Sequence, residues 1–182
     1  MFLDANIVYS SGVFETPQGA LERAQVRKFE LICRKLGLKQ NDRVLEIGTG
    51  RGGFAAYAAT TRGCRIWNTT IGKERFRSAQ EWFNRLGEAG KRIKLVLEDY
   101  RNLHDEVDKV VSIEMFEAVG LGNYDTYFAA CDRVLRPGGR CCRRSHLTNN
   151  AFRLINEVVI RFKSTFSRER SWRRWRDYPV VA

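Results

Sequence analysis

The sequence has no run of about 18 or more apolar residues, which excludes a helix long enough to span a membrane. Its N-terminus lacks a basic region followed by an apolar stretch, so we expect no secretory signal. The five cysteines form no Cys-x-x-Cys pair and only two histidines accompany them, so we expect no metal site. Together these absences favour a reduced cytoplasmic protein.

Acidic side chains are scarce only in the C-terminal part of the chain, residues 140–182. The net charge is +11 over 182 residues. Residues 140–182 hold 11 basic and 3 acidic side chains, whereas residues 1–139 hold 21 basic and 18 acidic ones. A balanced body joined to an arginine-rich end needs a separate explanation for each part. We therefore divide the chain into a core, 1–139, and an aberrant tail, 140–182.

Hydrophobic spacing and turn residues predict alternating helices and strands. Helices are expected at 19–37, from the glycine loop to 61, at 73–86 and at 123–135, and strands at 44–48, 64–71, 93–97 and 109–113. This alternation predicts an α/β fold, a parallel sheet flanked by helices and built by right-handed crossovers. Arg-Pro-Gly-Gly at 136–139 is expected to stop the last helix. No strand alternation follows, so we expect the sheet to be incomplete after its fourth strand.

A glycine-rich loop follows the first expected strand and opens the next helix. Gly48, Gly50 and Gly53 satisfy G-x-G-x-x-G, which by itself suggests a dinucleotide. A dinucleotide site would have an acid about 20 residues later, and residues 67–69 supply none. Glu46 instead stands inside the strand, where its carboxylate can attract the amino group of a methionine moiety. The pattern favours S-adenosylmethionine over a dinucleotide or a glycine turn that only packs strand on helix.

Further motifs follow one another in a definite order along the chain. They are Phe2-Leu3-Asp4, the YSSGVFE segment from Tyr9, Thr70-Ile71, the EDYR segment from Glu98, the VVSIEMFEAVG segment from Val110, and Asn123 to Phe128. With the glycine loop, they resemble the cyclopropane-fatty-acyl-phospholipid synthase and mycolic acid methyltransferase family over about residues 2–139. The resemblance implies a Rossmann-like S-adenosylmethionine-dependent methyltransferase.

The family's chemistry is implied by the same resemblance. Its members transfer a methyl group to a cis double bond of a phospholipid acyl chain, a bound bicarbonate removes a proton, and a cyclopropane ring closes. Glu117 matches the glutamate that helps to hold the bicarbonate, so it is the candidate catalytic residue. The implied partners are unsaturated acyl chains at the membrane surface, with peripheral contact at the inner membrane face, and we expect no specific nucleic acid.

The resemblance, with the glycine-loop reading, also implies a set of cofactor-binding residues. They are Tyr9, Ser10, Glu46, Gly48, Gly50, Gly52, Thr70, Ile71, Gly72, Arg75, Asp99 and Tyr100. Aromatic faces such as Tyr9, Phe14 and Phe116 can stabilise a sulfonium or a carbocation without acting as nucleophiles. The alternatives are that Phe14 and Phe116 are core residues and that Glu114 faces solvent or caps a helix.

The sequence departs from the family pattern at several of these motifs. Ser11 and Ala118 stand where the best-known members have Cys and His, and Thr49 and Arg51 stand where they have Cys and Trp. Asn68, Gly72 and Arg75 likewise replace Gly, Ser and Gln. Arg51 can extend outward along its aliphatic stem. Arg75 places a positive charge near a positive ligand.

The residues after Gly139 do not continue the family's sequence, and a strand there would bury Arg143 and Arg144. Codons can be chosen for residues 142–147 and 160–172 so that a shifted reading frame encodes other peptides. These peptides match the sequence that follows the same position in family members. We therefore hypothesise a frameshift near codons 140–142, which DNA sequencing tests, and expect the chain to fold poorly alone and to turn over no lipid. The alternative is a nucleic-acid or anionic-membrane patch at 168–176 with the neighbouring aromatic residues.

Overall fold

A computed structural model describes residues 10–149 and 152–161 of the chain. Its helices and strands are α1 (Leu21–Leu36), β1 (Arg43–Ile47), α2 (Gly53–Arg62), β2 (Arg65–Thr70), α3 (Lys73–Asn84), β3 (Ile93–Leu97), β4 (Val107–Ile113), α4 (Tyr124–Val134), β5 (Leu135–Asn149) and β6 (Phe152–Arg161). Short 3-10 helices lie at Gly90–Arg92, Tyr100–Asn102, Phe116–Val119 and Leu121–Asn123. The helices and strands predicted up to residue 135 are all present, with ends that differ by a few residues.

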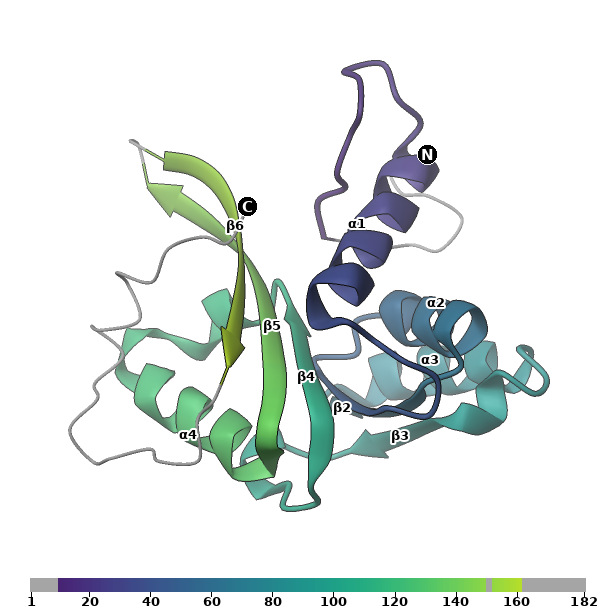
Figure 1. Cartoon of the computed structure of the whole chain (residues 1–182), viewed down its shortest axis with the longest axis vertical. Coiled ribbons are helices and arrows are strands. Elements are labelled where there is room, and N and C mark those ends of the chain that lie inside the picture. The colour runs from purple at the N-terminus through teal and green to yellow at the C-terminus, as the bar shows by residue number, and fades with distance from the viewer. Residues whose placement is uncertain (1–9, 150–151, 162–182) are drawn as a thin grey trace.

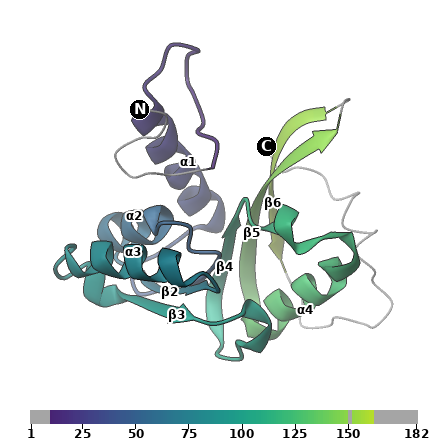
Figure 2. The same ribbon diagram turned by 180° about the vertical axis from the view of Figure 1, so that it is seen from behind.

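The strands form one sheet in the order β3-β2-β1-β4-β5-β6. β1 to β5 run parallel to their neighbours, and β6 is antiparallel to β5. α2 and α3 cover one face of the sheet and α4 covers the other (Figures 1 and 2). Each face has its own apolar core: Val44 packs with residues of α1, α2 and α3, whereas Leu45 packs with residues of α4. The α/β, Rossmann-like class is confirmed.

The expectation that the sheet would end after four strands is wrong. β5 continues it, and Arg140 to Arg144 pair in parallel with Lys109 to Ile113 of β4. Cys141 and Cys142 are both buried, one in the core beneath α4 and the other in the core beneath α1 and α2. A central parallel strand is buried on both faces and need not alternate between apolar and polar residues. The absence of alternation was therefore no evidence against a strand.

The Arg-Pro-Gly-Gly segment follows the end of α4, as expected, and itself lies inside β5. α4 ends at Val134, and β5 begins at the next residue. Val107 of β4 pairs with Leu135 of β5, and the next paired residues are Lys109 of β4 and Arg140 of β5. More residues of β5 than of β4 therefore lie between these two pairs. The extra residues of β5 form a bulge there, which accommodates a proline and a glycine with φ of 77°.

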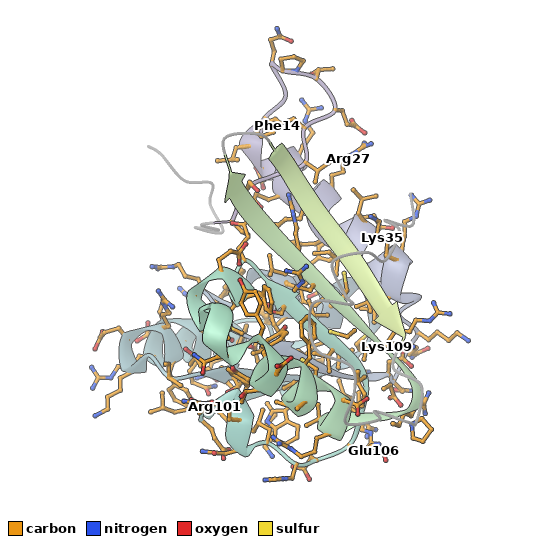
Figure 3. All side chains as sticks on the ribbon, turned by 90° about the vertical axis from the view of Figure 1, so that its left-hand side faces the viewer. Phe14, Arg27, Lys35, Arg101, Glu106 and Lys109 are labelled. Carbon is orange, nitrogen blue, oxygen red and sulfur yellow. The ribbon has the colours of Figure 1, made fainter. Side chains whose placement is uncertain are left out.

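α1 packs one face against the sheet and extends beyond it. Ile32 and Leu36 are fully buried, and Gly37 ends the helix with φ of 62°. Phe14, before α1, and Arg27, within it, lie at the opposite end of the molecule from Glu106 (Figure 3), and Phe14 is 47% exposed. Within the described residues, no helix has the length and apolar character needed to cross a membrane.

Candidate cofactor site

A cavity of about 430 Å³ lies beside the glycine loop, at the carboxyl ends of β1 and β4. This is the edge of an open parallel sheet where ligands bind. Fifteen residues line it: Ser10, Phe29, Glu46, Gly48, Thr49, Gly50, Arg51, Gly53, Phe54, Thr70, Arg75, Ile113, Glu114, Met115 and Ala118. Its volume is in the range of sites that take small molecules and cofactors.

The three loop glycines that are expected to bind the cofactor, Gly48, Gly50 and Gly52, have different surroundings. All three have positive φ, between 52° and 89°. A Cβ at Gly48 would lie 2.8 Å from Met115 Cγ, and one at Gly52 would lie 2.5 Å from the Phe83 ring. A Cβ at Gly50 would meet nothing within 4 Å. Gly50 therefore leaves bare backbone open to a ligand, whereas Gly52 allows the loop to pack on α3.

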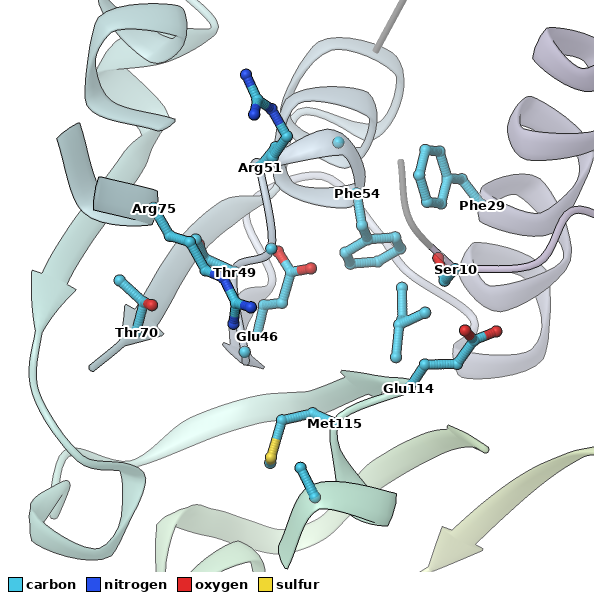
Figure 4. A pocket seen from close by; sticks show the side chains of 15 residues that line it. Ser10, Phe29, Glu46, Thr49, Arg51, Phe54, Thr70, Arg75, Glu114 and Met115 are labelled. Carbon is cyan, nitrogen blue, oxygen red and sulfur yellow. The ribbon is translucent and has the colours of Figure 1, made fainter. Parts of the chain in front are cut away.

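Glu46 brings a buried carboxyl group to the cavity wall. Its side chain is 3% exposed, and Asn68 Nδ2 donates a hydrogen bond of 2.8 Å to its Oε2. Burial raises the pKa of Glu46 to about 8, against the opposing effects of the Asn68 hydrogen bond and of the Lys28 charge. Glu46 lines the cavity together with Thr49 of the glycine loop (Figure 4).

A polar cluster inside α1 holds the N-terminal segment against the cavity. Lys28 is fully buried, and its ammonium group donates to the Oγ and the carbonyl oxygen of Ser10 and to Gln25. Gln25 Nε2 also donates to the Ser10 carbonyl oxygen over 2.7 Å. Ser10 lines the cavity, and Tyr9 lies outside the described residues. Gln25 and Lys28, polar residues on the apolar face of a helix, were the sequence signal for this cluster.

Glu114 supplies a second carboxylate to the cavity, from the residue that follows β4. Ser11 donates two hydrogen bonds to its Oε1, from the backbone nitrogen over 3.0 Å and from Oγ over 2.8 Å. Its φ is 48°, a left-handed conformation that few residues other than glycine adopt. The sequence suggested only that Glu114 faces solvent or caps a helix. It did not predict that Glu114 lines the cavity and accepts hydrogen bonds from Ser11.

The strained backbone at Glu114 gives a stability prediction. We expect Glu114→Gly to be more stable than Glu114→Ala by about 1 kcal/mol, because both variants lose the carboxylate and only alanine keeps the left-handed strain. Urea denaturation of the two variants measures the difference. Equal midpoints, or a more stable alanine variant, would contradict a left-handed residue 114.

The cavity brings together six of the predicted cofactor-binding residues: Ser10, Glu46, Gly48, Gly50, Thr70 and Arg75. Other predicted residues lie elsewhere. Asp99 caps the 3-10 helix that follows it and pairs with Arg101, which lowers the pKa of Asp99. Tyr100 packs edge-on against Tyr127, with ring centroids 5.6 Å apart. Ile71 is 76% exposed, and Gly72 precedes the first turn of α3.

The predicted catalytic residue, Glu117, does not line the cavity formed by the described residues. Its side chain is exposed, although its neighbour Ala118 is on the cavity wall. Phe116 is a core residue: it is 4% exposed and stacks on Tyr124 with ring centroids 4.1 Å apart. The Arg143 guanidinium lies over the same ring, 4.3 Å from its centroid.

Two arginines line the cavity, Arg51 from within the glycine loop and Arg75 from α3. Arg51 is exposed and points away from the cavity centre, whereas Arg75 reaches toward Thr70 and Glu46 (Figure 4).

Arg144 of β5 is completely buried, as expected for a strand at that position, and its Nη2 lies 3.4 Å from Ser11 Oγ. The buried arginine is therefore accommodated next to the Ser11–Glu114 contact.

An open parallel sheet with a glycine turn and a buried acid at the end of β1 defines a Rossmann-like, nucleoside-binding class of protein. Residues 1–165 match the mycolic acid cyclopropane synthetase family, and the chain belongs to that family. It is 43% identical over 137 residues to the cyclopropane-fatty-acyl-phospholipid synthase of Escherichia coli K12, covering 75% of this chain and 34% of that protein. It is 39% identical over 145 residues to the tuberculostearic acid methyltransferase UfaA1 of Mycobacterium tuberculosis, covering 76% and 34%.

Solved structures of the family share the fold. The cyclopropane synthase MmaA2 of Mycobacterium tuberculosis superposes with a TM-score of 0.76 at 29% identity, covering 81% of this chain and 52% of that one. The mycolic acid cyclopropane synthase CmaA1, complexed with S-adenosylhomocysteine (SAH) and CTAB, superposes with a TM-score of 0.74 at 28% identity, covering 79% and 50%. The chain spans about a third of the length of the curated relatives described above.

Proposed function

We propose that this chain binds S-adenosylmethionine (SAM) in the cavity and that the site serves methyl or methylene transfer to cis double bonds of phospholipid acyl chains. The observation that carries the proposal is the open backbone of Gly50 beside the buried carboxyl of Glu46, on one cavity wall. The lipid substrate is supported by relatives whose names state activity on fatty acyl chains, in Escherichia coli and Mycobacterium tuberculosis.

The charges of the cavity suit this cofactor. SAM carries an ammonium group, a carboxylate and a sulfonium, and when bound it supplies an electrophilic methyl group. Glu46 would hold the ammonium group once that cation displaces the proton that burial keeps on the carboxyl, and Arg75 is the guanidinium on the wall that suits the carboxylate. The positive charge of Arg75, unexpected beside a cationic ligand, then has a partner on the cofactor itself.

The proton acceptor of the family's reaction remains a proposal for this chain. The resemblance implies bicarbonate held by Glu117, which lies exposed next to a residue of the cavity wall. Asp99, Tyr100, Gly52, Ile71 and Gly72 likewise remain proposed cofactor contacts. Phospholipid would reach the site from a membrane surface.

Titration calorimetry with SAM tests the proposal, with NAD⁺ as the control ligand. We expect heat of binding with SAM and none with NAD⁺, because residues 67–69 of β2, about 20 positions after the glycine loop, supply no acid for a dinucleotide ribose. Binding of NAD⁺ alone would overturn the proposal in favour of the dinucleotide reading. Binding of neither ligand would favour a remnant without cofactor.

Mass spectrometry of phospholipids from a host that expresses the chain separates the possible products. A cyclopropane ring and a methyl branch each mark acyl-chain transfer, whereas methylation of another small molecule marks a different substrate. The expectation from the sequence, which stays a prediction, is that the 182-residue chain binds cofactor at most and forms neither lipid product. Detection of a cyclopropane product would contradict that expectation.

A further inference from the structure

The cavity has two glutamate side chains, and only Glu46 is used by the proposed contacts with the cofactor. Glu46 stands with Thr49, Thr70 and Arg75 on one side (Figure 4). Glu114 stands on the opposite side, next to Ser10. The methionine part of SAM carries two positive charges, on nitrogen and on sulfur. A second carboxylate across the cavity from the first matches that charge pattern.

The structure holds Glu114 in place from several directions. Ser11 Oγ and the Ser11 backbone nitrogen both donate to Oε1, at 2.8 and 3.0 Å. The backbone nitrogen of Glu114 donates to the Arg144 carbonyl oxygen over 2.8 Å, which ties the residue to β5. Its left-handed φ of 48° is retained against the strain that a side chain brings there. Strain kept at a cavity wall is typical of a residue whose direction serves a ligand.

We propose that Glu114, positioned by Ser11, is the residue that recognises the sulfonium charge and so distinguishes SAM from its neutral product SAH. The inference rests on the proposed function, since it assigns a residue to the same cofactor. The ammonium and carboxylate groups are common to both ligands, and only the sulfonium is lost in SAH. A carboxylate near the sulfur therefore changes the ratio of SAM affinity to SAH affinity. Glu46 does not change this ratio, because the ammonium group assigned to it is common to both ligands.

Titration calorimetry with SAM and SAH on wild-type chain and three variants tests this assignment. Glu114→Gln is expected to lower the ratio of SAM affinity to SAH affinity by about tenfold, because it removes one charge close to the sulfur. Glu46→Gln is expected to weaken both ligands alike. Glu81→Gln, which removes an exposed carboxylate on α3, is the matched control and leaves the ratio unchanged.

The outcomes separate this inference from the proposed function. An unchanged ratio in Glu114→Gln, with wild-type chain binding both ligands, overturns the role of Glu114 and leaves the cofactor site standing. Binding of neither ligand by wild-type chain overturns both. If Glu114→Gln does not fold, Ser11→Ala replaces it: losing the Oγ hydrogen bond should shift the ratio in the same direction by a smaller factor, and no shift overturns the inference.

Discussion

Replacing Gly52 by alanine is expected to destabilise the folded chain by about 3 kcal/mol. The new Cβ would lie 2.5 Å from Cε1 and Cζ of Phe83, a buried ring with 2% exposure. The φ of 87° at this position adds strain that glycine does not have. Chemical denaturation monitored by circular dichroism measures the loss.

Gly50→Ala is the matched control for this prediction. It also places alanine at a positive φ, 52°, but its Cβ would meet no atom within 4 Å. We expect it to cost about 1 kcal/mol, from backbone strain alone. In a Phe83→Leu background the cost of Gly52→Ala should shrink, because the atoms that clash are removed. Equal costs for the two glycines would contradict the packing of this loop on α3.

The stability of the folded chain is expected to fall as the pH rises from about 4.5 to about 8, through Glu46. Its pKa is raised from 4.5 to about 8 mainly by burial, so over this range the folded chain holds a proton that the unfolded chain has released. The contribution is fully present below about pH 4.5 and is lost as the pH passes the folded value. Its size is on the order of 5 kcal/mol, for a pKa raised from 4.5 to about 8.

Comparison of wild-type chain with Glu46→Gln isolates this contribution. Urea midpoints at pH 5 and pH 8 should show the fall in wild-type chain, and the glutamine variant, which has no proton to lose, should lack it. Glu81→Gln, an exposed glutamate, should behave as wild-type chain. Subtracting the two slopes removes contributions from other groups, including Asp99 and Glu30, whose pKa values are lowered. Parallel curves for wild type and Glu46→Gln would exclude a buried protonated Glu46.

Local sequence was sufficient to predict most of the fold. The helical spacing of Phe29, Ile32 and Leu36 and the stop at Gly37 predicted α1, and the short apolar runs predicted β1 to β4. The same method failed at β5, because a strand buried on both faces is not marked by alternation. Its place in the sheet comes from backbone pairing with β4 and from cysteines that pack into both cores.

The class of site can be recognised from the amino-acid sequence, in a glycine turn, an acid within the preceding strand, and a family pattern of motifs around them. Which of those residues meet one another depends on the tertiary structure. Asp99 and Glu117 belong to matching motifs yet lie off the cavity, whereas Ser11 and Glu114, 103 positions apart, join in one hydrogen-bonded pair. Contacts across such separations depend on how β4, β5 and the N-terminal segment pack together, which no local pattern of residues records.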